Sequence, residues 1–468
     1  MRHPITALVV GAGQRALIYA SYAQLHPDEL QIVAVAEPDA RRRHYTQQLY
    51  GLPSERCFRT AEEASSQPKL ADVAINGTMD HEHVPTSLPL LEAGYDLLLE
   101  KPFAVSESEM WDLVRAVRRY GRRVIICHVL RFAAFYVAIR QRVLDGAIGD
   151  VISMLTTEHV TYHHTALSYV RGKWARSEPR LEPAAQKRGS EPRAGGGHAS
   201  MLMSKCSHDL DLISWMKSGI RPRAVASFGS QFQFRPERTP EGAGTRCLVD
   251  CPIEPTCLYS ARKHYIDRDD RRNFYVWDGF RGTEEPTLAQ KIAALETDSP
   301  FGRCVWKSGT QVVDHQSVIV DFADGATATH VMVGGAVRPQ RSIHLIGTRG
   351  EIQGVFQDNR FVVRRIEPWR DADGVGGDAE ELVDLSIGDH ASRSANQHGG
   401  GDLRLVEDFL RIVRGEAPSI STTSLDDSVT GHLIGFTADR AMAERRAIDL
   451  AVGTVADCGS PDEAYRRR

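Results

Sequence analysis

"ITALVVGAGQRA" (residues 5–16) passes from an apolar strand through a glycine turn into the start of a helix. Its Gly11-x-Gly13-x-x-Ala16 spacing is an allowed form of the dinucleotide-binding fingerprint. Gly11 permits the tight turn, Gly13 lets the backbone approach a pyrophosphate, and the small Ala16 lets helix and strand pack closely. The stretch therefore predicts the nucleotide-binding end of a parallel sheet, with an ordinary strand, turn and helix as the alternative.

An acidic residue follows at a distance that suits ribose binding. Glu37 ends the second apolar run, QIVAVA at 31–36, close to the spacing of about 20 residues that is usual for this role. A carboxylate there favours NAD, because it can accept hydrogen bonds from the adenosine ribose. The basic run at 41–43 leaves NADP open as an alternative.

Strand and helix patterns alternate through residues 1–128. Further apolar runs occur at 72–77, 96–100 and 123–128, with amphipathic segments between them. Such alternation requires right-handed crossovers and a parallel sheet. We therefore predict an α/β protein whose residues 1–128 form a Rossmann domain with a doubly wound parallel sheet.

The pattern changes after this point. Alternating runs such as 316–322 and 341–347 are joined by tight turns, which predicts a large, open, mainly antiparallel sheet. We assign residues 129–455 to a C-terminal α/β domain that binds substrate, and we expect a homo-oligomer formed through its sheet. The polar stretch 175–200, rich in Pro, Gly, Arg and Glu, predicts a loop or lid.

Composition excludes several classes of protein. Hydrophobic residues make up 42% of the 468 residues and charged residues 25%, and the net charge is −4. These values are typical of a soluble globular protein and give no electrostatic footprint for nucleic acid. The apolar start is too short to span a membrane. Eight cysteines indicate no disulfide scaffold, so we expect a cytoplasmic protein.

A second stretch, LLLEKPFAV at 97–105, places two charges at the end of an apolar run. Charged side chains are rarely buried unless they are paired or used. At the carboxyl end of a parallel strand, Lys101 could bind a cofactor ribose or a substrate hydroxyl. The alternative is a salt bridge at the strand end between Glu100 and an arginine.

Three motifs together resemble a known family. The G-A-G-Q-R run at 11–15, the Glu-Lys-Pro triplet at 100–102 and the C-S-H-D-L-D run at 206–211 look like those of the Gfo/Idh/MocA oxidoreductases. The resemblance implies a Rossmann domain followed by a domain with an open sheet, and an NAD(P)-dependent oxidoreductase. It also implies that Lys101 contacts the nicotinamide ribose and the reactive hydroxyl, often with a cis peptide before the proline. The expected cofactor contacts are Gly11, Gly13, Gln14, Arg15, Ala16, Glu37, Thr78, His83, Glu100 and Lys101.

The resemblance points to His208 as the acid or base of the second domain. From the residues alone, the alternative is a core histidine held by Asp211, which shares its side of the predicted helix. Many family members have an aspartate four positions before this histidine, whereas this chain has Ser204, followed by Lys205. We take Lys101, Lys205 and His208 as the catalytic set, a basic site suited to an acidic or strongly polar sugar.

Substrate contacts are predicted from segments rich in aromatic and polar side chains. Such residues suit carbohydrate ring faces and hydroxyls, although surface strands also hold them, and Asp402 could simply cap the helix after His398. The predicted substrate-binding residues are Tyr162, His164, Arg171, Trp174, Asp211 and His398.

Three cysteines lie within a short loop segment, at positions 247, 251 and 257. Soft thiolates so closely spaced suit tetrahedral zinc, for which Cys247, Cys251, Cys257 and Cys304 are the predicted ligands, with Cys206 as another candidate for the fourth. Buried free thiols, an iron–sulfur cluster or a disulfide are the alternatives.

The sequence thus predicts an NAD(P)-dependent oxidoreductase that acts on a sugar, sugar acid or cyclitol by hydride transfer. A glycoside hydrolase or lyase that oxidises its sugar transiently, eliminates and reduces again is the second hypothesis. The third is a nucleotide-sensing or scaffold protein with a degraded site, which Ser204 mildly favours.

Overall fold

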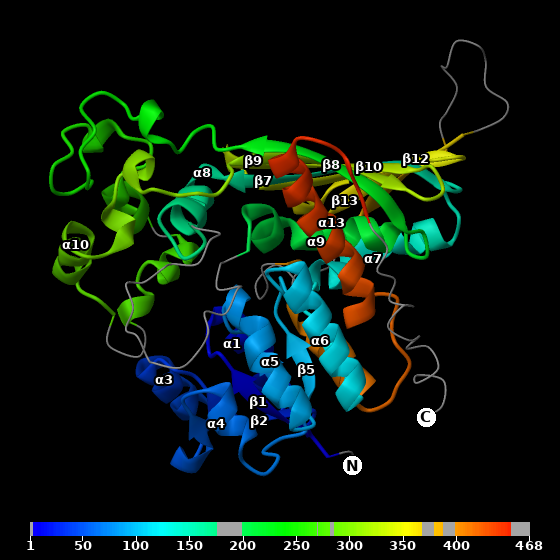
Figure 1. The fold of residues 1–468 in the computed structure, drawn as a ribbon, viewed down its shortest axis with the longest axis horizontal. Coiled ribbons are helices and arrows are strands. Elements are labelled where there is room, and N and C mark those ends of the chain that lie inside the picture. The colour runs from blue at the N-terminus through cyan, green and yellow to red at the C-terminus, as the bar shows by residue number, and fades with distance from the viewer. Residues whose placement is uncertain are drawn as a thin grey trace.

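The computed structural model describes residues 3–175, 199–268, 270–280, 285–366, 379–386 and 398–450. The predicted lid at 175–200 therefore lies almost entirely outside the described residues, as does the end of the predicted second domain. Two sheets lie one above the other in Figure 1, with helices between them. The fold class predicted from the sequence is confirmed.

The first sheet is parallel throughout, and its strands lie in the order β3-β2-β1-β4-β5-β6. The strand order reverses beside β1, where such folds bind their ligands. Its strands are β1 (Ile5–Val10), β2 (Leu30–Ala36), β3 (Cys57–Phe58), β4 (Val73–Asn76), β5 (Asp96–Leu99) and β6 (Val124–Ile126). The helices of this part are α1 (Gln14–Ala20), α2 (Tyr22–Leu25), α3 (Ala40–Tyr50), α4 (Ala61–Ser65), α5 (His83–Glu92) and α6 (Glu107–Tyr120).

The second sheet is larger and mainly antiparallel, in the order β14-β13-β12-β11-β7-β10-β9-β8-β15. Only the pair β7 and β10 is parallel among its described strands. Its strands are β7 (Val151–Thr161), β8 (Pro222–Ser230), β9 (His315–Phe322), β10 (Thr327–Ala336), β11 (Gln340–Gly347), β12 (Gly350–Val355), β13 (Arg360–Arg365), β14 (Ala379–Asp384) and β15 (Ile448–Asp449). The accompanying helices are α7 (Ala134–Leu144), α8 (Tyr162–His164), α9 (Met201–Met216), α10 (Leu288–Glu296), α12 (Gly401–Val413) and α13 (Leu425–Glu444).

One face of the second sheet buries its apolar residues against α9 and α13. Both helices lie between the two sheets in Figure 1. α9 is buried along almost its whole length, which explains why its sequence carries little amphipathic pattern. The helix is therefore held from several sides, and its polar residues have fixed positions.

The C-terminal part of the chain also returns to the first sheet. Leu405 and Phe409 of α12 belong to the same apolar core as Val9 of β1. The backbone of Thr423 pairs with Ile126 at the edge of β6. The boundary near residue 128 stays a prediction, because residues on both sides of it build the first layer.

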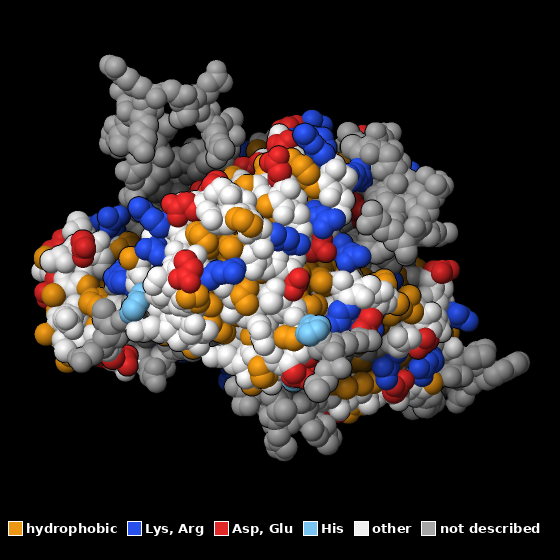
Figure 2. Space-filling view, turned by 90° about the horizontal axis from the view of Figure 1, so that it is seen from below, with side chains coloured by type: hydrophobic (Ala, Val, Ile, Leu, Met, Phe, Trp, Pro, Cys, Tyr) orange, Lys and Arg blue, Asp and Glu red, His pale blue; other side chains and the backbone are white. Residues whose placement is uncertain are grey.

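The surface carries both signs of charge. On the face shown in Figure 2, lysines and arginines are interspersed with acidic residues. Among the described helices, none is both long and apolar enough to span a bilayer.

Candidate active site

A cavity of about 920 Å³ lies between the carboxyl ends of β1, β2, β4 and β5 and the facing side of α9. Open α/β folds bind ligands at this end of the sheet. The predicted site residues that line it are Gly11, Gly13, Gln14, Arg15, Glu37, Thr78, His83, Glu100, Lys101, His164, Trp174, Lys205, His208 and His398.

The glycine turn at one end of the cavity leaves no room for a side chain at Gly11. Gly11 has a φ of +73°, and a Cβ there would lie 2.8 Å from the backbone of Thr78. A Cβ on Gly77 would lie 2.8 Å from the Cβ of Ala16. Ala16 is therefore buried against β4 and does not line the cavity, as its role in close packing requires. The turn presents bare backbone to the cavity, which fits a dinucleotide pyrophosphate.

Glu37 is buried beside this turn. One of its oxygens accepts a hydrogen bond from the Asp39 backbone at 2.9 Å, and the guanidinium of Arg42 lies 3.9 Å away. Burial raises the pKa of Glu37, although these neighbours oppose the effect. Arg42 is itself engaged by Asp278. The carboxylate lines the same cavity as Gly11 and Gly13.

Glu100 takes the salt bridge that the sequence offered as an alternative. Its Oε1 lies 2.7 Å from Nε of Arg15 and accepts a hydrogen bond from the Tyr19 hydroxyl at 2.9 Å. Arg15 also contacts Asp402, so the glycine turn is tied to the start of α12. Burial alone would raise the pKa of Glu100, but Arg15 and Lys101 lower it overall. The Glu100 carboxylate thus holds the side chains of Arg15 and Tyr19 in place. Of the two charged residues, Lys101 is the one available to a ligand in the cavity.

Lys101 spans the cavity from the end of β5 toward α9. Its Nζ donates to the backbone carbonyl of Ser204 at 2.6 Å. Burial lowers the pKa of Lys101, Glu100 and Asp80 oppose this, and Lys205 adds to it. The Lys101–Pro102 peptide is cis. His83 connects the segments that follow β4 and β5 by hydrogen bonds. Its Nδ1 lies 2.7 Å from the carbonyl oxygen of Pro102, and its Nε2 lies 3.1 Å from that of Thr78.

His208 faces the same space from α9. Its Nδ1 has no hydrogen-bond partner among the described residues. Burial lowers the pKa of His208 well below its ordinary value, and Lys101, His128 and His398 lower it further. The ring is therefore neutral at pH 7 and can accept a proton.

A second histidine lies beside it and has a carboxylate partner. The rings of His208 and His398 lie 5.9 Å apart between centroids. Nδ1 of His398 lies 3.0 Å from Oδ2 of Asp402. Asp402 does not cap α12, because Gly400 occupies the N-cap position. His398 therefore has the carboxylate support that Ser204 fails to provide for His208.

Lys205 is neutralised by a buried ion network. Its Nζ lies 3.1 Å from Oε1 of Glu158, whose other oxygen lies 2.7 Å from Nε of Arg341. Arg341 also pairs with Asp209 at 3.0 Å. The site therefore holds both signs of charge and is less basic than its lysines and histidine indicate.

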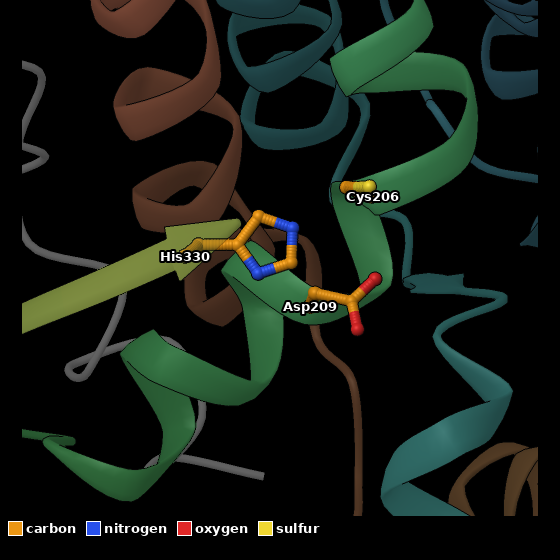
Figure 3. Close-up of side chains that lie close together, drawn as sticks. All are labelled: Cys206, Asp209 and His330. Atoms are coloured by element: carbon orange, nitrogen blue, oxygen red, sulfur yellow. The ribbon is translucent and has the colours of Figure 1, made fainter. Parts of the chain in front are cut away.

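Behind this network, Asp209 lies near Cys206 of the same helix and His330 of β10 (Figure 3). These three have ligand atoms within 4.8 Å of one another, and no other such group of three occurs in the described residues. Burial raises the pKa of the Cys206 thiol well above its ordinary value. Asp209 is already paired with Arg341 at 3.0 Å, so this group of three belongs to the buried ion network.

Three predicted substrate residues do not line the cavity. Asp211 receives two hydrogen bonds from Arg131, at 2.6 and 2.7 Å. Tyr162 contacts Tyr259 and His264. Arg171 donates to Cys247 and to backbone carbonyls near the cysteine segment. The four predicted zinc ligands also lie outside the cavity.

The sequence interpretation missed several polar residues of the cavity, above all Glu158, Arg341 and Asp80. Asp80 accepts a hydrogen bond from the Trp174 indole at 3.1 Å. Glu158 occupies a buried position in the alternating strand β7, and a carboxylate at such a position is the one signal that could have identified it.

Comparison with known proteins agrees with the Rossmann fold of the first part of the chain. Residues 5–128 match the family model described as "Oxidoreductase family, NAD-binding Rossmann fold". The putative oxidoreductase YteT of Bacillus subtilis is 23% identical over 346 residues, which are 72% of each chain. A trans-1,2-dihydrobenzene-1,2-diol dehydrogenase of Oryctolagus cuniculus is 25% identical over 54% of this chain and 72% of its own.

Solved structures share the fold at low identity. The WlbA dehydrogenase of Bordetella pertussis, in complex with NADH and UDP-GlcNAcA, has a TM-score of 0.63 at 15% identity and covers 97% of this chain and 99% of its own. A putative myo-inositol dehydrogenase of Sinorhizobium meliloti has a TM-score of 0.58 at 15% identity, with coverage of 96% and 100%.

The fold, the glycine turn at one end of the cavity and the similar proteins together define an NAD-dependent dehydrogenase. More particularly, its residues 5–128 match the family model of the Gfo/Idh/MocA oxidoreductases, and the resemblance expected from the sequence is confirmed over these residues.

Proposed function

We propose that the protein oxidises a CH–OH group of a sugar, sugar acid or cyclitol. The observation that carries the proposal is the meeting of Lys101, His208 and His398 in the cavity that also contains the glycine turn. Relatives whose names specify a substrate act on dihydrodiols or inositol, or were solved with a nucleotide sugar acid. All of these compounds carry several hydroxyl groups.

The roles follow from the geometry. The nicotinamide, when bound, supplies the hydride acceptor. Lys101 orients the reactive hydroxyl through its ammonium group, which Ser204 holds at 2.6 Å. His208, whose neutral imidazole ring lines the cavity, takes the hydroxyl proton. The alcohol thus loses a hydride and a proton and becomes a carbonyl.

The buried ion network binds the rest of the substrate. Lys205 and Arg341 both line the cavity and share Glu158 as their anion. A substrate carboxylate or a dense set of hydroxyls could accept hydrogen bonds from these cations. Trp174 and His164, at the same wall, would contact a sugar ring.

The cofactor is proposed to be NAD with Glu37 on its ribose. The buried carboxylate would repel a 2′-phosphate, and the nearest cation, Arg42, is already paired with Asp278.

One observation favours the redox-neutral glycosidase as a second candidate. The His398–Asp402 pair provides a second acid or base, which an elimination after transient oxidation would need. A panel of sugars, sugar acids, cyclitols and aryl glycosides separates the two. Net NADH release that matches product identifies the dehydrogenase. Glycoside cleavage that requires NAD without net NADH identifies the glycosidase, and tight NAD binding without turnover on any compound contradicts both.

The outer face of the second sheet supports a homo-oligomer. Leu155, Thr329 and Ile319 lie in one row across β7, β10 and β9, and both Leu155 and Ile319 are exposed. A second copy would cover this apolar row. Light scattering should show a multimer that Ile319→Lys dissociates. We place the protein in the cytoplasm, in keeping with the free thiols of its described cysteines.

A further inference from the structure

The segment around residues 245–307 forms a lobe with limited apolar cores of its own. Two small clusters hold it together, one around Cys304 and Trp306 and the other around Cys247 and Tyr265. Small cores of this kind are usually reinforced by disulfides or a metal. The cysteines here are free, so the lobe has no disulfide among its described residues.

The backbone brings the distant cysteine to the cysteine loop. The backbone N–H of Cys304 donates to the carbonyl of Thr245 at 2.8 Å, and the backbone N–H of Cys247 donates to the carbonyl of Gly302 at 2.9 Å. A bridge between Arg246 and Arg303 completes this short ladder. Cys257 packs against the apolar cluster that contains Cys304.

Three of the sulfurs accept N–H donors. The backbone of Tyr259 donates to Sγ of Cys257 at 3.3 Å, and Nη2 of Arg171 donates to Sγ of Cys247 at 3.4 Å. The backbone N–H groups of Trp306 and Lys307 donate to the sulfur of Cys304. Donors aimed at sulfur stabilise thiolates, as around metal-bound cysteine.

Arg171 provides an independent observation. Its side chain is buried, and its hydrogen bonds go to the carbonyls of Arg303 and Tyr259, the Tyr265 hydroxyl and the Cys247 sulfur. No described carboxylate forms an ion pair with it. A buried guanidinium without a counter-charge is costly. Thiolates at the neighbouring cysteines would supply that charge.

We propose that Cys247, Cys251, Cys257 and Cys304 bind one structural Zn²⁺ as four thiolates, with Arg171 as the counter-ion to their excess negative charge. Zn–S bonds of about 2.3 Å would bring the sulfurs to about 3.8 Å from one another. No three of them meet within 4.8 Å here, so binding must draw them together. Cys251 and Cys257 are only partly buried, whereas Cys247 and Cys304 are buried.

The proposed metal would also support the cavity wall. Arg171 lies directly after Val170 and close to Tyr169 and Trp174, and the last two line the cavity. A zinc-fixed lobe would therefore hold that wall in place without taking part in the chemistry.

The first test is elemental analysis of the full chain, purified without added metal. We expect close to one zinc per chain, released by a thiol-blocking mercurial and detected with a zinc-sensitive dye. Metal near zero, with the cysteines freely alkylated in the native state, overturns the proposal, as does iron in place of zinc.

Matched variants locate the metal. Cys304→Ser and Cys257→Ser should lose zinc, whereas Cys206→Ser should keep it, because Cys206 belongs to the separate group with Asp209 and His330. Zinc lost only in Cys206→Ser overturns the assignment. If the serine variants do not fold, zinc release from the unaltered chain during titration with the mercurial still tests whether thiols hold the metal. All these readouts are independent of activity, so they stand whether or not the proposed function holds.

Discussion

The two ends of the cavity are built in different ways. The nucleotide end is built around one continuous turn, from Gly11 to Ala16, in which Gly11 and Ala16 allow close packing against a single neighbouring strand. The substrate end is made of side chains from β5, α9 and the segment before α12, which lie far apart in the sequence. A backbone site can tolerate the loss of one side chain, whereas a site made of single side chains cannot. Substitutions at the two ends should therefore have very different consequences.

The largest effect is expected at His208. His208→Asn removes the proton acceptor, and losing an acid–base group typically costs about 10²–10⁴-fold in rate. Steady-state kinetics on the substrate found in the panel measures this loss. Ser207→Ala, a change at the adjacent buried position of α9, is the control and should keep near-native turnover. Equal activity of His208→Asn and Ser207→Ala would remove His208 from the mechanism.

Acid should destabilise the substrate end next most strongly. Burial first, and neighbouring charges second, lower the pKa values of His128, His164, His208 and His432 well below 6.5. Below pH 6.5 the unfolded chain therefore binds more protons at these histidines than the folded chain does. The free energy of unfolding is consequently highest above pH 6.5 and decreases as the pH falls. Each unit of lowered pKa corresponds to about 1.4 kcal/mol.

Thermal unfolding between pH 8 and pH 5 measures this effect. His432→Gln is a useful comparison, because His432 accepts a hydrogen bond from the Phe103 backbone at 3.2 Å and a glutamine oxygen could still accept it. We expect the variant to lose less stability in acid than the unaltered protein. A melting temperature that does not change down to pH 5 would contradict the buried neutral histidines.

The smallest effect is expected at the nucleotide end. Glu37→Ala removes hydrogen bonds to the ribose but leaves the glycine turn intact, so NAD should bind about 10-fold more weakly, equivalent to about 1.4 kcal/mol. NADP binding should weaken less, because the lost carboxylate no longer repels a 2′-phosphate. Fluorescence titration with both cofactors measures the ratio, and an equal loss for both would remove Glu37 from this role.

The same difference explains what the sequence could predict. Gly11, Ala16 and Glu37 could be interpreted because their spacing along the chain reflects their places in the fold. The sequence predicts Arg171 and Tyr162 as substrate contacts, but a π-helical turn at Thr165–Val170 lies between them. The side chains of this segment that line the cavity are instead those of His164, Ser168, Tyr169, Lys173 and Trp174. Asp211 was expected near the substrate and instead holds Arg131, a pairing that no local pattern reveals.

The other contacts of the site that the sequence did not predict join residues that lie far apart along the chain. Asp402 was considered a helix cap, yet it binds Arg15 and His398, the first of which lies near the other end of the chain. Glu158 and Arg341 come from separate strands of the second sheet and meet only when β7 pairs with β11. Such pairs depend on the tertiary fold, so the family resemblance indicated His208 but not the groups around it.

The account depends most directly on Lys101, which links the two ends of the cavity. The decisive measurement compares NAD affinity and substrate turnover in Lys101→Ala with those of the unaltered protein. We predict that turnover falls by about 10²–10⁴-fold while NAD affinity stays nearly the same, because the glycine turn holds the phosphates. Lys101→Arg should rescue poorly, since a planar guanidinium cannot replace a compact ammonium whose pKa burial lowers. Near-native turnover in Lys101→Ala would contradict the account and leave the Glu100–Arg15 salt bridge as the sole purpose of the charged pair.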